Sequence, residues 1–401
     1  FPALILALMA TFLFGLGTFA GTAALTIYTL AILVRLTYED IESQPRRAFA
    51  VLRTMGCGRG RAYVRGVVPE ILPTFLTNTF YMLEANVRQS AILGYVGAGG
   101  IGLLLNEKMS WREYAKAGMI LLLLLGTVCL IEWISQSLSE IVRGERRVSS
   151  KTKRWLIVSG AGVFLFCAVT TQPPDFSHTS LTVLTNMLLG FVQPDFSFMT
   201  DLTHSGLLWL LLETILISFL GTLLGAVLSF PLALLNTRSL MPTPVSLCFR
   251  FLVLVIRAVP FLIYGLIFVR VTGQGAFTGV LTIGICSVGL ITKRFTQAIE
   301  AMDLKAWRAL RVMGTPVFHS IRYGLMPQLI PAFSSTVLYR FDVNIREASI
   351  LGLVGAGGIG TPLIFAMNHY DWRTAGAISI GLIAIVWIID LVSARLRKST
   401  Q

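Results

Sequence analysis

An eleven-residue, glycine-rich segment occurs twice in this chain, and its repetition constrains the fold more than any other feature. Residues 92–102 read ILGYVGAGGIG and residues 350–360 read ILGLVGAGGIG, so ten of eleven positions agree at an offset of 258. The same offset relates Glu42 to Glu300, Gly56 to Gly314, Asn86 to Asn344 and Arg88 to Arg346. This spacing is far longer than a solenoid unit, and it predicts two copies of one domain in a single chain.

We predict a first copy over residues 1–142, a basic connector over 143–154 and a second copy over 155–401. The stretch of the second copy that precedes Pro260 has no counterpart in the first copy. Because the chain opens with Phe rather than Met, we expect the first copy to be truncated at its N-terminus. One or more membrane spans would then be missing in front of it.

The composition is that of an integral membrane protein. Hydrophobic residues make up 55% of the chain and charged residues 13%, with a mean hydropathy of +0.75, whereas a soluble domain carries about a quarter charged residues. Many apolar runs approach the ~20 residues with which a helix crosses a bilayer. We therefore predict an all-α polytopic fold with spans near residues 2–14 (cut short), 20–36, 71–88, 117–136, 155–172, 207–235, 249–271, 276–293, 328–346 and 374–394.

Clusters of basic residues set the expected orientation in the membrane. Two loops, the connector and the C-terminal tail hold these clusters, and the positive-inside rule predicts that all four are cytoplasmic. The residues are Arg46, Arg47, Arg53, Arg59, Arg61 and Arg65; Lys293, Arg294, Lys305, Arg308, Arg311 and Arg322; Arg143, Arg146, Arg147, Lys151, Lys153 and Arg154; and Arg395, Arg397 and Lys398. The net charge of +13 is therefore a topology signal, and we do not expect nucleic-acid binding.

The number of predicted spans fixes how the two copies are related. Segment 172–206 has Asp175, Asp195 and Asp201 but no Lys or Arg, which suits the outer side. Six predicted spans separate the two basic loops, and an even number returns the chain to the same side. The copies are then expected to be parallel repeats, related by a pseudo-twofold axis along the membrane normal.

Each basic loop has the pattern of a short helix, a glycine and a second short helix. The pattern residues are Glu42, Ala48 and Gly56 in the first copy, and Glu300, Ala306 and Gly314 in the second. An amphipathic element of this kind is expected to dock into a groove on a soluble partner. The alternative is an amphipathic helix that lies on the lipid surface.

These loops resemble the EAA motif of permease subunits in binding-protein-dependent ABC importers, where Glu, Ala and Gly at this spacing form a coupling helix. The glycine-rich segment, preceded by Arg88 or Arg346, is similar to the phosphonate permease family (PhnE) in particular. The resemblance covers nearly the whole chain and implies a type I ABC importer permease-like helical bundle. Members of that family are usually single-copy subunits that pair as homodimers, whereas this chain carries both copies.

The repeated glycines formally spell a dinucleotide-binding fingerprint, at Gly97, Gly99 and Gly102 and at Gly355, Gly357 and Gly360. That interpretation requires a preceding strand and an acidic residue about 20 positions later. Only Leu122 and Ile380 stand there, within apolar runs. We expect instead a broken helix near the outer end of a span, where the glycines form a gate or allow close packing.

Charged residues inside predicted spans are candidates for a substrate pathway, because ionisable groups in a bilayer normally face a bundle interior or a pathway. The candidates are Arg88, Arg346, Arg340 and Arg257. An arginine fork suits an oxyanion, but Asp342 and Arg346 are also spaced to form an ion pair on one helix. Arg340 aligns with Met82 in the first copy, so a pathway that includes Arg340 would be asymmetric.

No GxxxxGK[ST] phosphate loop occurs in the sequence, so ATP is expected to bind to partner subunits. The resemblance implies a non-enzymatic translocation subunit of the bacterial inner membrane, with two cytoplasmic ABC ATPase subunits and an extracytoplasmic substrate-binding protein as partners. The scattered Cys and His residues predict neither a metal centre nor a cofactor. The implied cargo is a phosphonate or phosphite oxyanion; methionine, a quaternary ammonium compound, a sulfur oxyanion or an ATPase-independent transporter are the alternatives.

Overall fold

The computed structural model describes residues 3–43, 47–95, 97–144, 149–171, 181–201, 203–204 and 206–400. All regular elements in these ranges are helical. The chain forms two compact units, Phe1–Val183 and Leu184–Gln401. These units follow spatial contacts rather than the repeat, so the predicted limits of the two copies stay predictions. Arg46, Arg146, Arg147 and Asp175 lie outside the described residues.

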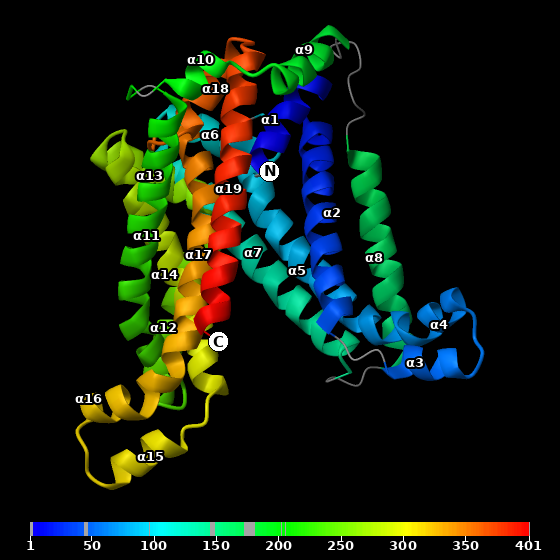
Figure 1. The fold of residues 1–401 in the computed structure, drawn as a ribbon, viewed down its shortest axis with the longest axis vertical. Helices are drawn as coiled ribbons and strands as arrows, with labels where there is room; N and C mark the ends of the chain where they lie inside the picture. Colours follow the sequence, from blue (N-terminus) through cyan, green and yellow to red (C-terminus); the bar gives the residue numbers. More distant parts are fainter. Residues whose placement is uncertain are drawn as a thin grey trace. The chain divides into compact units, whose positions relative to one another are not determined.

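The first unit contains eight helices within its described residues (Figure 1). They are α1 (Ala3–Phe14), α2 (Thr18–Ser43), α3 (Arg47–Thr54), α4 (Arg59–Gly66), α5 (Val68–Tyr95), α6 (Ile101–Ser110), α7 (Tyr114–Val142) and α8 (Ser150–Thr170). Helix α5 packs against both α2 and α7, and α3 and α4 form a hairpin between α2 and α5.

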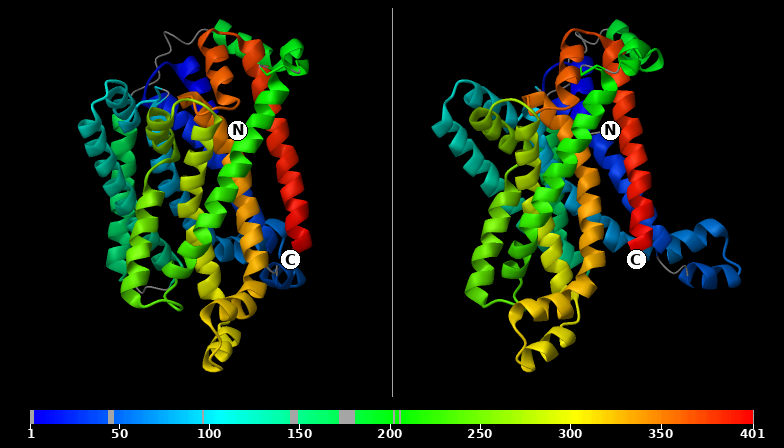
Figure 2. Two further views of the ribbon diagram at one scale, coloured as in Figure 1. Left: turned by 90° about the vertical axis from the view of Figure 1, so that its left-hand side faces the viewer. Right: turned by 60° about the vertical axis from the view of Figure 1, so that its left-hand side comes forward.

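The second unit has the same succession of elements, with additional helices in front. They are α9 (Leu181–Val192, which begins in the last residues of the first unit), α10 (Phe196–Thr200), α11 (Leu207–Asn236), α12 (Thr243–Ala258), α13 (Phe261–Thr272), α14 (Ala276–Ala301), α15 (Lys305–Val312), α16 (Val317–Ser320), the π-helical turn η1 (Ile321–Leu325), α17 (Met326–Leu351), the 3-10 turn η2 (Gly352–Val354), α18 (Gly360–Asn368) and α19 (Trp372–Thr400). Figure 2 shows α15 and α16 projecting beyond the ends of α14 and α17.

The repeat seen in the sequence is also a repeat of secondary structure. Adding 258 to the bounds of α1, α2, α3 and α7 gives the bounds of α13, α14, α15 and α19. Helix α5 corresponds in the same way to α17 followed by η2. The predicted duplication is therefore confirmed element by element, and side chains at equivalent positions can be compared directly.

Five helices in the described residues are long and apolar enough to cross a membrane, namely α2, α7, α11, α14 and α19. Helices α5 and α17 have 28 and 26 residues, and their polar side chains make them less apolar. The described apolar part of α8, Val158–Thr170, is shorter than the ~20 residues of a full span. The predicted multi-pass helical protein agrees with these elements.

The run over residues 249–271, predicted as a span, forms two helices with a break between them. The chain bends by 85° between α12 and α13. Pro260 has no N–H to donate and disfavours helical backbone at the residue before it, and Val259 is extended, with ψ of 122°. The run is apolar, as predicted, and its residues are divided between two helices. Helix α1 is equivalent to α13, the second helix of this bent pair.

Small residues bring α11 and α14 together along much of their length. A Cβ added at Gly225 would lie 2.5 Å from Cβ of Ser287, and one added at Gly221 would lie 2.7 Å from Cγ2 of Ile283. Close backbone approach through small residues is typical of helix pairs in membranes, where apolar burial alone drives little association.

Charged side chains in the connection between α6 and α7 form local ion pairs. Lys108 lies 2.9 Å from Glu107 and 3.4 Å from Glu113, and Lys116 lies 2.7 Å from Glu113. The hydrogen bond from Lys116, aided by the charges of Lys116 and Lys108, lowers the pKa of Glu113. The acidic partners balance the positive charge of these lysines, whose expected position on the outer side departs from the positive-inside rule.

Candidate functional site

Two matching hairpins contain the predicted loop residues. We name α3 with α4 hairpin 1 (residues 47–66) and α15 with α16 and η1 hairpin 2 (residues 305–325). In hairpin 1 the N–H of Cys57 donates to the carbonyl of Leu52 at 3.1 Å, and in hairpin 2 the N–H of Thr315 donates to the carbonyl of Leu310 at 3.2 Å. These bonds close the last turn of each first helix in the same way.

Glycine is required at the turn of each hairpin. Gly56 has φ of +82° and Gly314 has φ of +80°, in the left-handed region that side chains with a Cβ rarely adopt. No atom lies within 4 Å of a Cβ built at either glycine. The requirement is therefore conformational rather than steric, and the predicted helix–Gly–helix pattern is confirmed.

An arginine closes each turn, and neither of these two arginines is among the predicted site residues. Nη1 of Arg53 donates to the carbonyl of Cys57 at 3.0 Å, and Nη1 of Arg311 donates to the carbonyl of Thr315 at 3.1 Å. The two arginines differ by the repeat offset of 258. The carbonyls that they satisfy follow the turn glycines, where no helical N–H is available.

In each hairpin a second glycine allows the two helical arms to pack closely against each other. A Cβ at Gly66 would lie 3.1 Å from N of Phe49, and a Cβ at Gly324 would lie 3.0 Å from Cα of the equivalent Trp307. The pattern alanines, Ala48 and Ala306, are exposed. The methionines at the tips, Met55 and Met313, are 74% and 71% exposed, so each tip carries exposed apolar surface.

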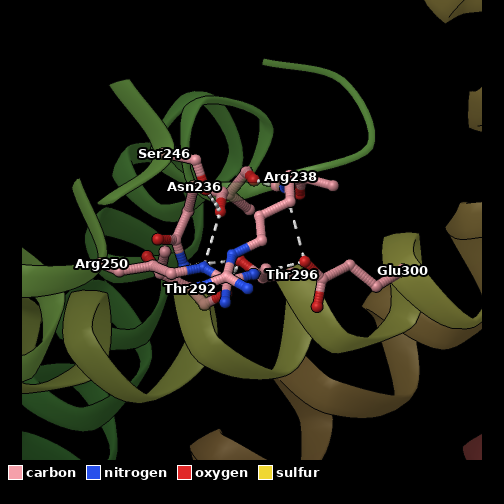
Figure 3. A network of polar contacts seen from close by, with 9 residues as sticks. Asn236, Arg238, Ser246, Arg250, Thr292, Thr296 and Glu300 are labelled. Atoms are coloured by element: carbon pink, nitrogen blue, oxygen red, sulfur yellow. Dashed lines mark hydrogen bonds and ion pairs between the residues drawn. The ribbon is translucent and has the colours of Figure 1, made fainter. Parts of the chain in front are cut away.

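Glu300 lies at the end of α14 and takes part in a polar network there (Figure 3). Its Oε1 accepts from Nη2 of Arg250 on α12 and, at 3.4 Å, from the backbone N–H of Arg238. Nε of Arg250 also donates to the carbonyl of Asn236 at 3.3 Å. Glu300 therefore ties the connection between α11 and α12 to α14.

The rest of this network is buried. Oγ of Ser246 donates to the carbonyl of Asn236 at 2.7 Å, and the amide of Asn236 donates to Oγ1 of Thr296 at 3.0 Å. In the first copy the equivalent Glu42 is exposed, as Glu300 is.

The repeated glycine-rich segments form tight turns at the ends of α5 and α17. Gly97, Gly99 and Gly100 have φ of +86°, +77° and +83°, and the equivalent Gly355, Gly357 and Gly358 have φ of +85°, +81° and +74°. The helix break that the sequence predicts is present in both copies. Helices α5 and α17, rather than strands, precede the two turns.

Gly102 and Gly360 serve a different purpose, because they lie at the start of the next helix, very close to the backbone of the preceding one. A Cβ at Gly102 would lie 2.0 Å from the carbonyl oxygen of Ala91, and a Cβ at Gly360 would lie 2.1 Å from that of Ser349. Gly352, which was not among the predicted residues, packs against Gly360 in the same way. The roles of gate and of packing remain proposals, while the close approach is an observed property of the turns.

Ion pairs hold the charged residues of α5 and α17. Arg88 lies 2.8 Å from Glu84, and Arg346 lies 2.6 Å from Asp342, as its spacing predicts. Glu84 and Asp342 are equivalent positions of the repeat. Each copy therefore carries the same pair, one helical turn apart, at the same place on its helix.

Arg340 takes part in a buried network that only the second copy has. It lies 2.6 Å from Oε2 of Glu347 and 3.3 Å from Oε1, and its Nε donates to Oγ of Ser287 at 3.3 Å. Met82 and Gln89 replace this pair in the first copy. The side chain of Arg257 packs over Gly289, where an added Cβ would lie 2.8 Å from Cγ of Arg257.

No group of three or more metal-ligating side chains occurs in the described part of the chain.

The sequence is similar to those of known membrane transport proteins. The sequence pattern of the family described as binding-protein-dependent transport system inner membrane component matches residues 1–140 and 225–399. The phosphate-import permease protein PhnE of Mycolicibacterium smegmatis is 29% identical over 407 residues, which cover 99% of this chain and 75% of that protein. The phosphite transport system permease protein PtxC of Stutzerimonas stutzeri is 35% identical over 47% of this chain and 69% of its own length.

A solved structure of the MetNI methionine ABC transporter, in an inward-facing conformation, is also similar. It has a TM-score of 0.44 and 18% identity, and the match covers 48% of this chain and 97% of that one. The chain belongs to the family of binding-protein-dependent transport system inner membrane components, as an ABC importer permease with two copies fused in one polypeptide.

Proposed function

We propose that this permease imports a phosphorus oxyanion such as phosphate, phosphite or a phosphonate across the bacterial cytoplasmic membrane. Two ABC ATPase subunits bind hairpins 1 and 2 on the cytoplasmic side, and a substrate-binding protein delivers the cargo from the outer side. The single observation that carries the coupling role is the matching geometry of the two hairpins, from the turn glycines to Arg53 and Arg311.

The cargo class rests on the relatives and on the charged residues of the spans. The relative matched over 99% of this chain is named a phosphate-import permease, and a second is named a phosphite permease. Arg88 and Arg346 supply planar donors that suit tetrahedral oxyanions. Because Arg340 is buried in its pair with Glu347, we assign it to stabilising α17 rather than to the pathway.

The orientation rests on the basic loops. Hairpins 1 and 2 and the C-terminal end of α19 are rich in Lys and Arg and are assigned to the cytoplasm. Movement of the ATPase subunits on ATP binding would press on both hairpins. Glu300 would pass the displacement of hairpin 2 to α11 and α12 through Arg250 and Arg238.

The test is uptake into proteoliposomes that contain the permease, its ATPase subunits and its binding protein. Radiolabelled phosphate is the probe, with phosphite, methylphosphonate, sulfate, methionine and glycine betaine as competitors. Competition by phosphite or methylphosphonate is expected. Competition by methionine, glycine betaine or sulfate alone would replace the proposed cargo, and uptake without ATPase subunits would identify an ATPase-independent transporter.

Replacing Gly314 by Val tests the coupling role of hairpin 2. A side chain at φ of +80° costs about 1–2 kcal/mol, so the turn is expected to change shape. We expect ATP hydrolysis to continue while uptake per ATP falls. Gly126→Val is a control in α7, where an added Cβ meets nothing within 4 Å. Unchanged uptake per ATP in the Gly314 variant would count against the proposal.

A further inference from the structure

We propose that each copy holds an oxyanion-binding element made of an acid, an asparagine and an arginine two residues apart, in which the acid and the asparagine position the arginine. The elements are Glu84, Asn86 and Arg88 on α5, and Asp342, Asn344 and Arg346 on α17. The inference rests on the proposed function, because it names the groups that contact the phosphorus oxyanion cargo.

The spacing places the three side chains on two opposite faces of one helix. At 3.6 residues per turn, the acid and the arginine lie about 40° apart around the axis, and the asparagine lies about 200° from the acid. The acid and arginine therefore share one face, and the asparagine points to the other. This arrangement occurs in both copies at the repeat offset.

The asparagine fixes the rotation of its helix. The amide of Asn86 donates to Oγ1 of Thr29 on α2 at 2.8 Å. The amide of Asn344 donates to Oγ of Ser287 on α14 at 2.9 Å, and Ser287 is the repeat equivalent of Thr29. In the second copy Asn344 also donates to Thr222 on α11 at 2.7 Å.

Breaking the hydrogen bonds of Asn344 would cost substantial free energy, because its side chain is fully buried. An unpaired amide away from water costs about 1–3 kcal/mol. The helix is thus held with its acid and arginine pointing to the opposite face. The rotational setting is the same in the two copies because the same two positions form the bond.

The acid is more buried than the arginine in both pairs. The side chains of Glu84 and Asp342 are 9% and 7% exposed, whereas those of Arg88 and Arg346 are 21% and 31% exposed. The carboxylate is therefore an anchor inside the bundle, and the guanidinium extends from it toward the surface. Such an anchor lets an arginine stay charged in the membrane without its cargo.

The ion pair uses only part of the hydrogen-bonding surface of the arginine, and the rest can contact a ligand. The contact between Arg346 and Asp342 uses the terminal nitrogen Nη2, and a guanidinium carries five N–H donors in a planar fork. The other edge of the fork matches two oxygens of a tetrahedral oxyanion, with charge-assisted hydrogen bonds. Arg346 lies five residues before the end of α17, about 8 Å from the glycine-rich turn along the helix axis.

Arg340 does not belong to this element. It lies on the asparagine face, where Glu347 and Ser287 engage it, and its side chain is 6% exposed. Because the first copy has Met82 at this position, Arg340 is also not part of the repeated pattern.

The test measures the concentration dependence of radiolabelled phosphate uptake in the complete reconstituted transporter. Arg346→Gln and Asp342→Asn are each expected to raise the apparent KM about tenfold to a hundredfold, the worth of a charged hydrogen bond. Asp342→Glu installs the acid of the first copy and is expected to restore the KM to within about threefold of the wild type. Arg88→Gln and Glu84→Gln are expected to repeat the effect in the first copy.

The control is Arg35→Gln, which breaks an exposed ion pair of the same spacing with Glu39 on α2 and is expected to leave the KM unchanged. The positioning role is overturned if Asp342→Asn and Asp342→Glu lower the maximal rate equally at a constant KM, which marks a purely structural acid. It is also overturned if Asp342→Asn lowers the KM, since the acid would then compete with the cargo. If the wild type takes up phosphate and Arg346→Gln has the same KM, only this inference fails; if the wild type takes up no phosphorus oxyanion, the proposed function fails.

Discussion

Replacing Arg340 by Met and Glu347 by Gln gives the second copy residues with the chemistry of Met82 and Gln89 in the first copy. The change removes an ion pair of 2.6 Å between side chains that are 6% and 19% exposed. The first copy keeps the same helix without this pair, so the backbone tolerates both replacements. The single and double variants therefore isolate the energy of the pair.

The expected magnitudes follow from burial. Removing one partner of a buried ion pair costs about 3–5 kcal/mol, because the other charge stays buried without its counterion. Arg340→Met leaves Glu347 partly exposed, so we expect the lower value, about 3 kcal/mol. Glu347→Gln leaves the more buried Arg340 charged, and we expect about 4 kcal/mol. The double variant is expected to lose less than about 2 kcal/mol, because neither charge remains.

The assay is a double-mutant cycle of unfolding free energies. Each purified variant is titrated with SDS in mixed micelles, and helix content is followed by circular dichroism. The coupling energy should exceed about 3 kcal/mol, well above the 0.5 kcal/mol within which independent sites add. Losses that add within 0.5 kcal/mol would refute the buried-pair reasoning, as would a loss below about 1 kcal/mol for Glu347→Gln alone.

Three further predictions concern the turns and the network of Glu300. Gly360→Ala places a Cβ 2.1 Å from the carbonyl oxygen of Ser349, so it should cost about 3 kcal/mol in the same titration, whereas Gly118→Ala in open space should not destabilise α7. Arg311→Gln removes the bond to the carbonyl of Thr315 and should weaken ATPase binding about fivefold by surface plasmon resonance, while Arg308→Gln on the same helix serves as its comparison. Glu300→Ala should speed hydrogen exchange at the amide of Arg238, and an unchanged rate would remove Glu300 from the α11–α12 connection.

The element order was predictable from the sequence because the glycines and prolines that begin or end helices recur at the repeat offset. The break at Pro260 was missed because the run over residues 249–271 is uniformly apolar, and hydropathy does not register an 85° bend. The ion pair of Asp342 and Arg346 was predictable from i, i+4 spacing. The same spacing separates Glu84 and Arg88 in the first copy, so their ion pair was predictable on the same ground.

Other contacts depend on tertiary structure. Glu300 and Arg250 are 50 positions apart, and only the packing of α12 on α14 brings them together. Arg340 pairs with Glu347 two turns away, a distance that single-turn pairing rules do not reach. Arg53 and Arg311 bond to carbonyls of their own turns, so the repeat offset together with the glycine positions was the available signal.

We propose that this two-copy permease moves a phosphorus oxyanion only when ATPase subunits act on its two hairpins. The most direct measurement is accumulation of radiolabelled phosphate in proteoliposomes that hold the permease and binding protein, with and without the ATPase subunits and ATP. Phosphate is expected to accumulate against its concentration gradient only in the complete, ATP-supplied system. Equal accumulation without the ATPase subunits would contradict it.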